Sequence, residues 1–206
     1  MRVVPWGVHL PEWVRATPFA SSTLSAMIIG SGHDPVALAA ALEGLSRACP
    51  PEKELLIFVD ADAGRRGRVW RVANRLGITG AVSFVDNLEA RRDLLVAGDL
   101  LLAPEARGEH RTALLEAFAC EMLVVAAKDP RVSWLRDGET ARLVDNPTPK
   151  AWETALRDLI ASPATARAFA ASAKHFVAQR HLASTQLAAL ADLYAWTSGS
   201  MKIAPS

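Results

Sequence analysis

The amino-acid sequence predicts an α/β fold, in which a parallel sheet of about six strands carries helices on both faces. Two observations support this prediction. Short apolar segments alternate with longer segments of helical spacing from about residue 25 to residue 144. The apolar segments, such as LLIFV at 55–59, are nearly continuous, which is typical of strands that are buried on both faces. Right-handed crossovers through the helices would then join the strands.

Composition and charge narrow the class of protein. The chain has 206 residues, half of them apolar, which is enough for one well-buried domain. Its net charge of +1, from 23 basic and 22 acidic residues, disfavours a role in bulk nucleic-acid binding. Cys49 and Cys120 lie far apart without metal-site spacing, so we expect two reduced, buried thiols. No apolar run approaches the roughly 20 residues that cross a bilayer, and the N-terminus lacks a signal-like apolar core, so we expect a cytoplasmic protein.

The elements follow one another in a regular order. Residues 1–25 are rich in Pro, Trp, Ser and Thr, which favours an N-terminal arm or connector before a domain at 26–197. Gly77 follows a helical segment and predicts a C-terminal cap. Strands are expected at 25–30, 54–59, 80–85, 99–103, 122–126 and 141–144, and helices at 36–47, 64–76, 88–97 and 112–119.

The last third of the chain is helical in pattern. Three alanine-rich segments, at 150–160, 163–180 and 183–196, have high helix propensity. The last one carries an apolar stripe, and we expect this stripe to pack into the core of the same domain. The residues of the stripe are Leu187, Leu190, Leu193 and Tyr194. Residues 198–206 are expected to form a flexible tail.

The stretch 104–125, PEARGEHRTALLEAFACEMLVV, holds the candidate site. A strand end, a polar loop, a short helix and a second strand follow one another there. This order places a helix N-terminus at the rim of a parallel sheet, where α/β proteins bind phosphates. His110, Arg111 and Thr112 stand at the helix start. Glu116 lies one helical turn after Thr112, inside the apolar run ALLEAFA, where a glutamate needs a partner.

The chain resembles the C-terminal half of a group 1 glycosyltransferase of the GT-B fold, the Rossmann-like domain that binds a nucleotide-sugar. Segments that match the family occur in its order over nearly the whole chain. They are VPWGVHLP, AMIIGSG, LLIFVDADAG, LGITGAVSFVD, LLVAGDLLLAPEARGEHRTALLEAFACEMLVVAA, LRDGETARLV, AWETALRDLI and LADLYAW. In this family VPWGVHLP joins the two halves of the enzyme, so the resemblance implies a donor-binding half, either isolated or a fragment, that needs an N-terminal acceptor-binding half to complete the transfer.

The resemblance also implies roles for individual residues. Glu116 matches the second glutamate of the family's paired-glutamate motif, which binds the ribose hydroxyl groups of the donor. The donor, a nucleoside diphosphate-sugar of unknown identity, takes the place of any cofactor, and neither a metal cluster nor a catalytic base is evident. The candidate donor-binding residues are Gly30, Ser31, Val85, His110, Arg111, Thr112 and Glu116, with Glu109 as the candidate sugar contact.

Several loop positions depart from the family pattern. The first glutamate of the pair falls on Gly108, and Glu109 is one residue too late. Ser31 replaces an arginine, and the usual lysine is missing from SGHDPVALAAALEG, which removes charge-assisted hydrogen bonds worth roughly 1.5–3 kcal/mol each. Arg111, and Arg65 or Arg66, are candidates to restore part of that charge, although ordinary surface roles remain open for them. Acidic residues at family glycine positions are Asp60, Asp62 and Glu121.

Three functions remain open at this point. A donor-binding domain of a glycosyltransferase predicts measurable binding of a nucleoside diphosphate. A degenerate, non-catalytic module with the same fold predicts no binding of any nucleotide-sugar. A sugar-nucleotide epimerase, which can share the fold, predicts a changed free sugar nucleotide rather than a transferred sugar.

Overall fold

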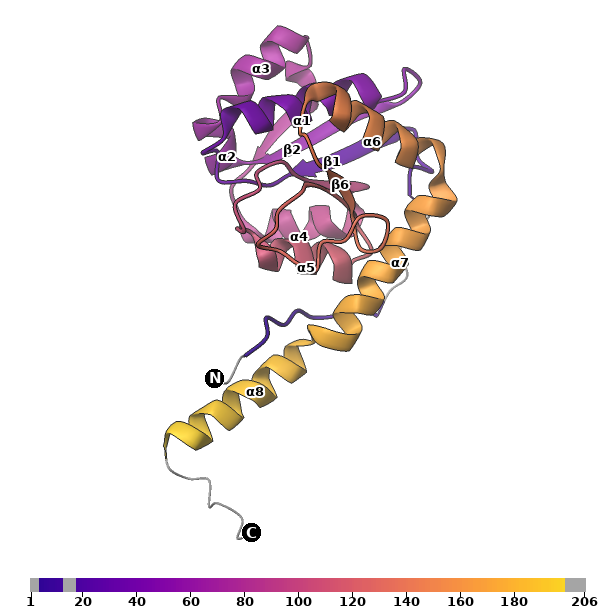
Figure 1. The fold of residues 1–206 in the computed structure, drawn as a ribbon. Helices are drawn as coiled ribbons and strands as arrows, with labels where there is room; N and C mark the ends of the chain where they lie inside the picture. The colour runs from indigo at the N-terminus through magenta and orange to yellow at the C-terminus, as the bar shows by residue number, and fades with distance from the viewer. Residues whose placement is uncertain (1–3, 13–17, 199–206) are drawn as a thin grey trace.

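The computed structural model describes residues 4–12 and 18–198 of the chain. Six parallel strands form one sheet in the order β3-β2-β1-β4-β5-β6 (Figure 1). The strands are β1 (Thr23–Ile28), β2 (Glu54–Asp60), β3 (Val82–Val85), β4 (Leu100–Ala103), β5 (Leu123–Ala127) and β6 (Arg142–Val144). All six strands were expected from the sequence, with shifts of one or two residues at their ends, so the α/β prediction is confirmed.

Helices cover both faces of the sheet, and α1 and α6 lie on the face opposite to α4 and α5 (Figure 1). The helices are α1 (Pro35–Ala48), α2 (Ala61–Arg66), α3 (Val69–Leu76), α4 (Leu88–Ala97), α5 (Arg111–Ala119), α6 (Pro149–Ala161), α7 (Pro163–Arg180) and α8 (Ala183–Thr197). A 3-10 turn, η1 (Thr79–Ala81), precedes β3, and that strand starts two residues later than predicted. Gly77 caps α3 in the left-handed conformation, as expected.

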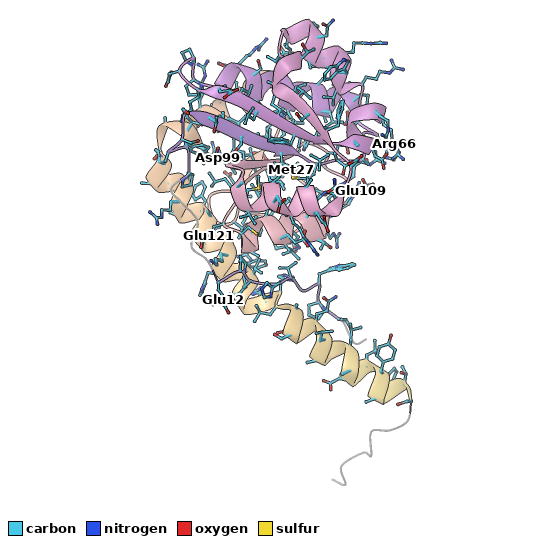
Figure 2. All side chains as sticks on the ribbon, turned by 180° about the vertical axis from the view of Figure 1, so that it is seen from behind. Glu12, Met27, Arg66, Asp99, Glu109 and Glu121 are labelled. Atoms are coloured by element: carbon cyan, nitrogen blue, oxygen red, sulfur yellow. The ribbon has the colours of Figure 1, made fainter. Side chains whose placement is uncertain are left out.

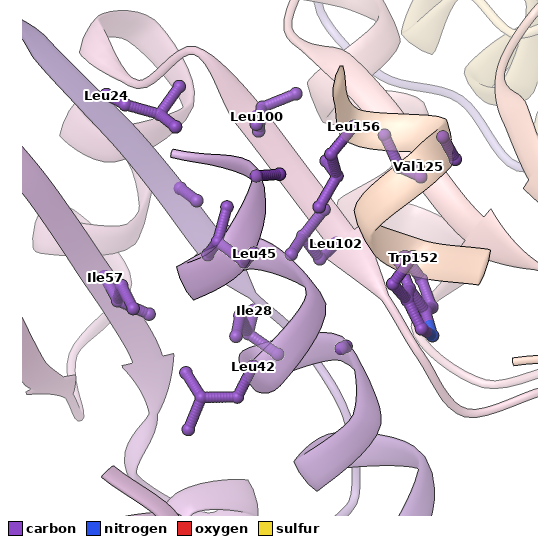
Figure 3. Close-up of a cluster of buried hydrophobic side chains, with 14 of the residues drawn as sticks. Leu24, Ile28, Leu42, Leu45, Ile57, Leu100, Leu102, Val125, Trp152 and Leu156 are labelled. Carbon is purple, nitrogen blue, oxygen red and sulfur yellow. The ribbon is translucent and has the colours of Figure 1, made fainter. Parts of the chain in front are cut away.

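Each face of the sheet has its own apolar core because the side chains of a strand alternate between the faces. Leu24, Ala26 and Ile28 of β1 pack under α1 and α6, whereas Met27 packs on the α5 side. The first core is drawn in Figure 3, where Trp152 of α6 lies beside strand residues. Gly44 of α1 permits this packing, because a Cβ atom there would lie 2.3 Å from the Cβ atom of Trp152.

The order of the strands creates a topological switch point. From β1 the chain moves outward through β2 to β3, and it then returns to add β4 on the other side of β1. The loops after β1 and β4 therefore leave the sheet side by side and diverge, which opens a crevice at the carboxyl ends of the strands. Ligands of open α/β sheets bind in such crevices.

The prediction of one helix at 64–76 is wrong, because two helices, α2 and α3, occupy this region. Asp60 begins α2 early, since its Oδ1 atom accepts hydrogen bonds from the backbone N–H groups of Asp62 and Ala63. The helix ends at Gly67, whose backbone lies tightly against the Leu38 side chain. Arg68 then takes a left-handed φ of 53°, which separates the two helices.

The expectation that the apolar stripe of the last helix packs into the domain core is also wrong. The helix α8 has no buried residue, and Leu187 and Tyr194 are 66% and 70% exposed. Figure 1 shows α8 extending away from the domain. Part of the expected N-terminal arm lies at its start, where Val8 exchanges backbone hydrogen bonds with His181 and Ala183. Apart from Ser198, the expected tail lies outside the described residues.

Among the described residues, no helix has both the length and the apolar character needed to cross a bilayer.

Candidate functional site

The carboxyl ends of the strands gather the loops that hold the candidate residues. Figure 2 shows Arg66 and Glu109 at this end of the strands and Asp99 at the opposite end. Gly30, Glu109, His110 and Asp129 line a narrow cavity between the loops that follow β1, β4 and β5. Three of the predicted residues, Gly30, Glu109 and His110, therefore line a cavity at the edge of the sheet where ligands of such folds bind.

The carboxylate of Glu105 binds the loop that precedes α1, on the other side of the crevice. Its Oε2 atom accepts hydrogen bonds from the backbone N–H groups of Ser31 and Gly32 and from the Ser31 hydroxyl group. Its Oε1 atom accepts a hydrogen bond of 2.7 Å from the N–H group of Asp34. A carboxylate from the loop after β4 therefore satisfies the backbone donors of the loop after β1. The N–H and hydroxyl groups of Ser31, a predicted donor-binding residue, therefore already donate to a side chain of the same protein.

The start of α1 carries a second acidic cap. The Oδ1 atom of Asp34 accepts a hydrogen bond of 2.9 Å from the N–H group of Ala37. One cation reaches the same loop, since the guanidinium group of Arg66 donates to the carbonyl oxygen of Ser31 at 3.3 Å. Arg65 instead pairs with Asp62 at the surface. Two carboxylates and one exposed arginine thus surround the start of α1.

The start of α5 has the opposite character. His110 precedes the helix in a left-handed conformation, φ 56°, and no side chain caps the helix by a hydrogen bond. The first N–H groups of this helix therefore lack the side-chain acceptor that α1 has. A hollow of about 360 Å³ opens at this position, and it is lined by Trp6, Arg91, Gly108, His110, Arg111, Thr112 and Ala113.

A buried carboxylate fixes the loop that leads into α5. Asp129 accepts hydrogen bonds from the backbone N–H groups of Gly108 and Arg131. Arg111 completes the link, because its Nε atom donates to the carbonyl oxygen of Gly108 at 3.1 Å and its Nη2 atom donates to that of Arg131 at 3.0 Å. Gly108 has a φ of 69°, in the region that favours glycine. Gly108, which stands at the position of the first glutamate of the pair, therefore lies in a turn that these hydrogen bonds hold in place.

The other predicted residues lie around this hollow rather than inside it. Glu109 is 42% exposed at its side chain and pairs with Arg107 at 3.5 Å. Val85 lines a hollow of about 110 Å³ that shares Arg91 with the one at α5. Arg91 is itself paired with Asp60. Glu116 lines a separate hollow of about 410 Å³, together with His9, Pro11, Arg92, Leu95, Val96 and Cys120.

Glu121, which replaces a family glycine before β5, keeps the conformation of a glycine. Its φ is 54°, and its carboxylate pairs with Lys174 of α7 at 2.8 Å. The turn before β5 therefore accommodates a glutamate in a conformation that favours glycine, and the glutamate side chain adds an ion pair to α7.

Glu105, Asp129 and Arg91 were not predicted from the sequence as parts of the site. Glu105 carried a usable signal, because it is a charged residue two positions after an apolar strand at the sheet rim. Asp129 follows the next strand in the same way. No group of His, Cys, Asp and Glu side chains within residues 4–12 and 18–198 is arranged to hold a metal ion. Cys49 is half-buried, and burial raises the pKa of its thiol group.

Comparisons with known proteins identify the family of the chain and proteins of similar fold. The profile of a family described as "Glycosyl transferases group 1" matches residues 36–162. The D-inositol 3-phosphate glycosyltransferase of Rhodococcus jostii (strain RHA1) is 32% identical over 146 residues, which are 67% of this chain and 32% of that protein. The aligned part thus spans about a third of the length of this curated relative.

Two solved structures have similar folds. Anabaena HepE in complex with UDP and glucose superposes with a TM-score of 0.68 and 21% identity, covering 84% of this chain and 48% of HepE. The C-terminal domain of the group 1 glycosyl transferase LpcC from Francisella tularensis superposes with a TM-score of 0.63 and 13% identity, covering 87% and 97% of the two chains. These likenesses confirm the fold expected from the sequence, the Rossmann-like C-terminal half of the GT-B architecture.

Proposed function

The chain belongs to the group 1 glycosyltransferases, and we propose that it is the domain that binds the nucleoside diphosphate-sugar from which the sugar is transferred. One observation carries this proposal. The start of α5 combines uncapped backbone N–H groups, an adjacent hollow and the guanidinium group of Arg111. The solved complex of HepE with UDP and glucose supports a uridine nucleotide as the first donor to test.

The diphosphate is the part of the donor that this helix start suits. Aligned peptide dipoles place about half a positive charge at a helix N-terminus, and free N–H groups there point toward a bound anion. The described residues show no ion pair between Arg111 and a carboxylate; its guanidinium group binds two carbonyl oxygens. Its charge therefore remains to attract phosphate oxygens, and each charge-assisted hydrogen bond contributes roughly 1.5–3 kcal/mol.

The nucleoside and sugar are assigned to the neighbouring residues. We place the base toward Val85, in the hollow that shares Arg91 with the hollow at α5. Glu116, one turn along α5 from Thr112, is the proposed ribose contact, and it lines a hollow that Arg92 also lines. Glu109 remains the candidate for the sugar, and it must leave Arg107 to reach it.

An acceptor-binding half is the partner that this proposal requires. The exposed apolar side chains of α8 and the adjoining N-terminal segment, Leu187, Tyr194, Trp196 and Trp6, offer a surface for it. Apolar patches of this kind on an otherwise folded domain mark interaction sites. The transfer reaction itself, and the identity of the sugar and acceptor, belong to the complete enzyme.

Binding of UDP by the whole chain, measured by calorimetry, tests the proposal. Arg111→Gln removes the charge at the start of α5 but keeps an amide that can donate to Gly108. We expect UDP to bind about tenfold more weakly to this variant, because one charge-assisted contact is lost. Arg75→Gln is the matched control, since Arg75 pairs with Glu43 on the exposed face of α3 and should leave UDP affinity unchanged. If Arg111→Gln and the control Arg75→Gln bind UDP with equal affinity, the assignment of Arg111 is contradicted.

Glu116→Ala tests the ribose contact separately. Removing a carboxylate that accepts from ribose hydroxyl groups should weaken UDP binding about tenfold, while the binding of inorganic pyrophosphate, which has no ribose, should not change. The exposed Glu139, paired with Arg136, provides the control substitution Glu139→Ala. If UDP binds equally well to wild type and Glu116→Ala, Glu116 has no role in donor recognition.

One observation favours a second function, a non-catalytic binding module of the same fold. The loop after β1 holds the chain's own Glu105 where the family carries cations. A protein that had lost donor binding would tolerate such a contact. Failure of UDP to bind to wild type and to every variant would favour this alternative.

A further inference from the structure

We propose that Glu105 is a built-in anion that closes the loop after β1 and thereby confines the donor's diphosphate to the start of α5. The four hydrogen bonds that its carboxylate accepts come from three residues of one loop, Ser31, Gly32 and Asp34. Glu105 lies 71 to 74 positions away in the sequence, so this is a contact between two loops of the crevice.

The chemistry of the contact is that of an anion site that is already filled. Converging N–H groups of neighbouring residues bind carboxylate and phosphate oxygens alike, and these hydrogen bonds are stronger because the acceptor is charged. A phosphate group that entered this loop would have to displace the carboxylate from all four donors. It would also meet a second negative charge at Asp34, whose side chain caps the same helix.

The carboxylate of Glu105 lies close to the backbone that follows β1. A Cβ atom placed on Gly30 would lie 2.8 Å from the Oε2 atom of Glu105, so the carboxylate rests directly against the backbone at the end of β1. The Oε1 and Oε2 atoms face different donors of the loop and therefore span its opening. A phosphate group that bound these N–H groups would therefore have to replace the carboxylate of Glu105.

The start of α5 supplies the contrast that gives the contact a role. That helix has no side-chain cap, and Arg111 adds a cation to it. With the first loop closed, a diphosphate has one open helix start in the crevice among the described residues. The identity of the excluded group as a diphosphate rests on the proposed function, whereas the closure of the loop does not.

Pyrophosphate binding to Glu105→Gln and Glu105→Ala tests this inference. Glutamine keeps the size of the side chain but loses the charge and turns an NH2 group toward N–H donors, and alanine empties the loop. We expect both variants of the whole chain to bind inorganic pyrophosphate at least about tenfold more tightly than wild type. The backbone amide signals of Ser31, Gly32 and Asp34 should shift on addition of pyrophosphate in the variants and not in wild type. Glu139→Gln, at an exposed ion pair, should behave as wild type.

The outcomes separate this inference from the proposed function. Equal pyrophosphate affinities in wild type and in the folded variants, or a gain that leaves the amide signals of the loop unmoved, overturns the role of Glu105. A circular dichroism spectrum like that of wild type establishes that each variant is folded. If the variants gain pyrophosphate affinity but no protein binds UDP more tightly than pyrophosphate, the role of Glu105 stands and nucleotide binding fails. If UDP binds tightly and equally to all proteins and the variants gain no pyrophosphate affinity, nucleotide binding stands and the role of Glu105 fails.

Discussion

The two helices that begin at the crevice, α1 and α5, have the same kind of start and opposite environments. Each follows a loop from the carboxyl end of a strand, β1 or β4, and each points its first N–H groups toward the crevice. The carboxylate of Glu105 binds the backbone N–H groups of the loop that leads into α1, and the carboxylate of Asp34 caps the helix. The start of α5 has no side-chain cap and lies beside Arg111.

This difference teaches that a helix N-terminus at a switch point is a potential anion site only while the protein leaves it empty. Local sequence identifies both starts equally well, because both follow apolar strands and polar loops. The occupant of the first start comes from the loop that leads toward the second. The loop after β4 therefore serves both helices, since Glu105 closes one and the turn at Gly108 shapes the other.

The largest expected effect comes from Asp129, because it holds the open start in place. Asp129→Asn removes the charge that accepts from the N–H groups of Gly108 and Arg131, and an amide can satisfy only one of them through its oxygen. Loss of a buried acceptor should lower the free energy of unfolding by about 1–3 kcal/mol. UDP affinity should also fall, about tenfold, because the loop before α5 loses its fixed turn. Denaturant unfolding and calorimetry measure the two effects.

The same variant should leave the closed start intact. Amide hydrogen exchange at Ser31 and Gly32 should match that of wild type, because Glu105 does not bond to Asp129 among the described contacts. Asp145→Asn, in an exposed pair with Lys128, is the control and should change the free energy of unfolding by less than about 1 kcal/mol. Faster exchange in both loops would show that the two helix starts are one cooperative unit and would remove the basis of the comparison.

The fold was predictable from the sequence because burial on both faces makes the strands continuous and apolar. The segment LLIFV became β2, and the predicted helices at 88–97 and 163–180 have the observed bounds. Prediction failed where local propensity met tertiary contacts. The helix expected at 64–76 is broken next to Gly67, which packs on Leu38, a residue that local sequence does not connect to it.

The last helix shows the same limit in another form. The sequence predicts that its apolar stripe packs into the domain core, because amphipathic helices of one domain usually bury their apolar face there. The structure instead leaves Leu187 and Tyr194 exposed on a helix that points away from the sheet. An apolar stripe establishes that a helix has a partner surface, and it does not say whether that surface belongs to the same domain.

The sequence predicts which candidate residues lie near one another, but it does not predict which of the chain's own side chains bind there. The order of strand, loop and helix placed His110, Arg111 and Thr112 together, and one hollow does contain them. Glu116 was expected to face the same ligand, yet it lines a separate hollow along the same helix, so its ribose role stays a prediction. The contact of Glu105 joins loops more than 70 positions apart, and no local pattern contains that information.

Arg66 provides the smallest and most discriminating effect. Its guanidinium group donates to the carbonyl oxygen of Ser31, beside the closed loop, and its side chain is exposed. In wild type, Arg66→Gln should leave pyrophosphate affinity unchanged, because Glu105 already fills the loop. In the Glu105→Gln background the same change should weaken pyrophosphate binding about threefold, since an exposed cation contributes little but measurable attraction to a bound anion.

The cycle of four proteins, wild type, each single variant and the double variant, isolates this dependence, because residues that share a partner do not act additively. Arg65→Gln is the matched control, since the adjacent Arg65 pairs with Asp62 rather than with the loop. An equal effect of Arg66→Gln in both backgrounds would mean that pyrophosphate reaches the loop while Glu105 is present. The closed start of α1 would then be as accessible to anions as the open start of α5, and the difference between the two helices would lie in Arg111 alone.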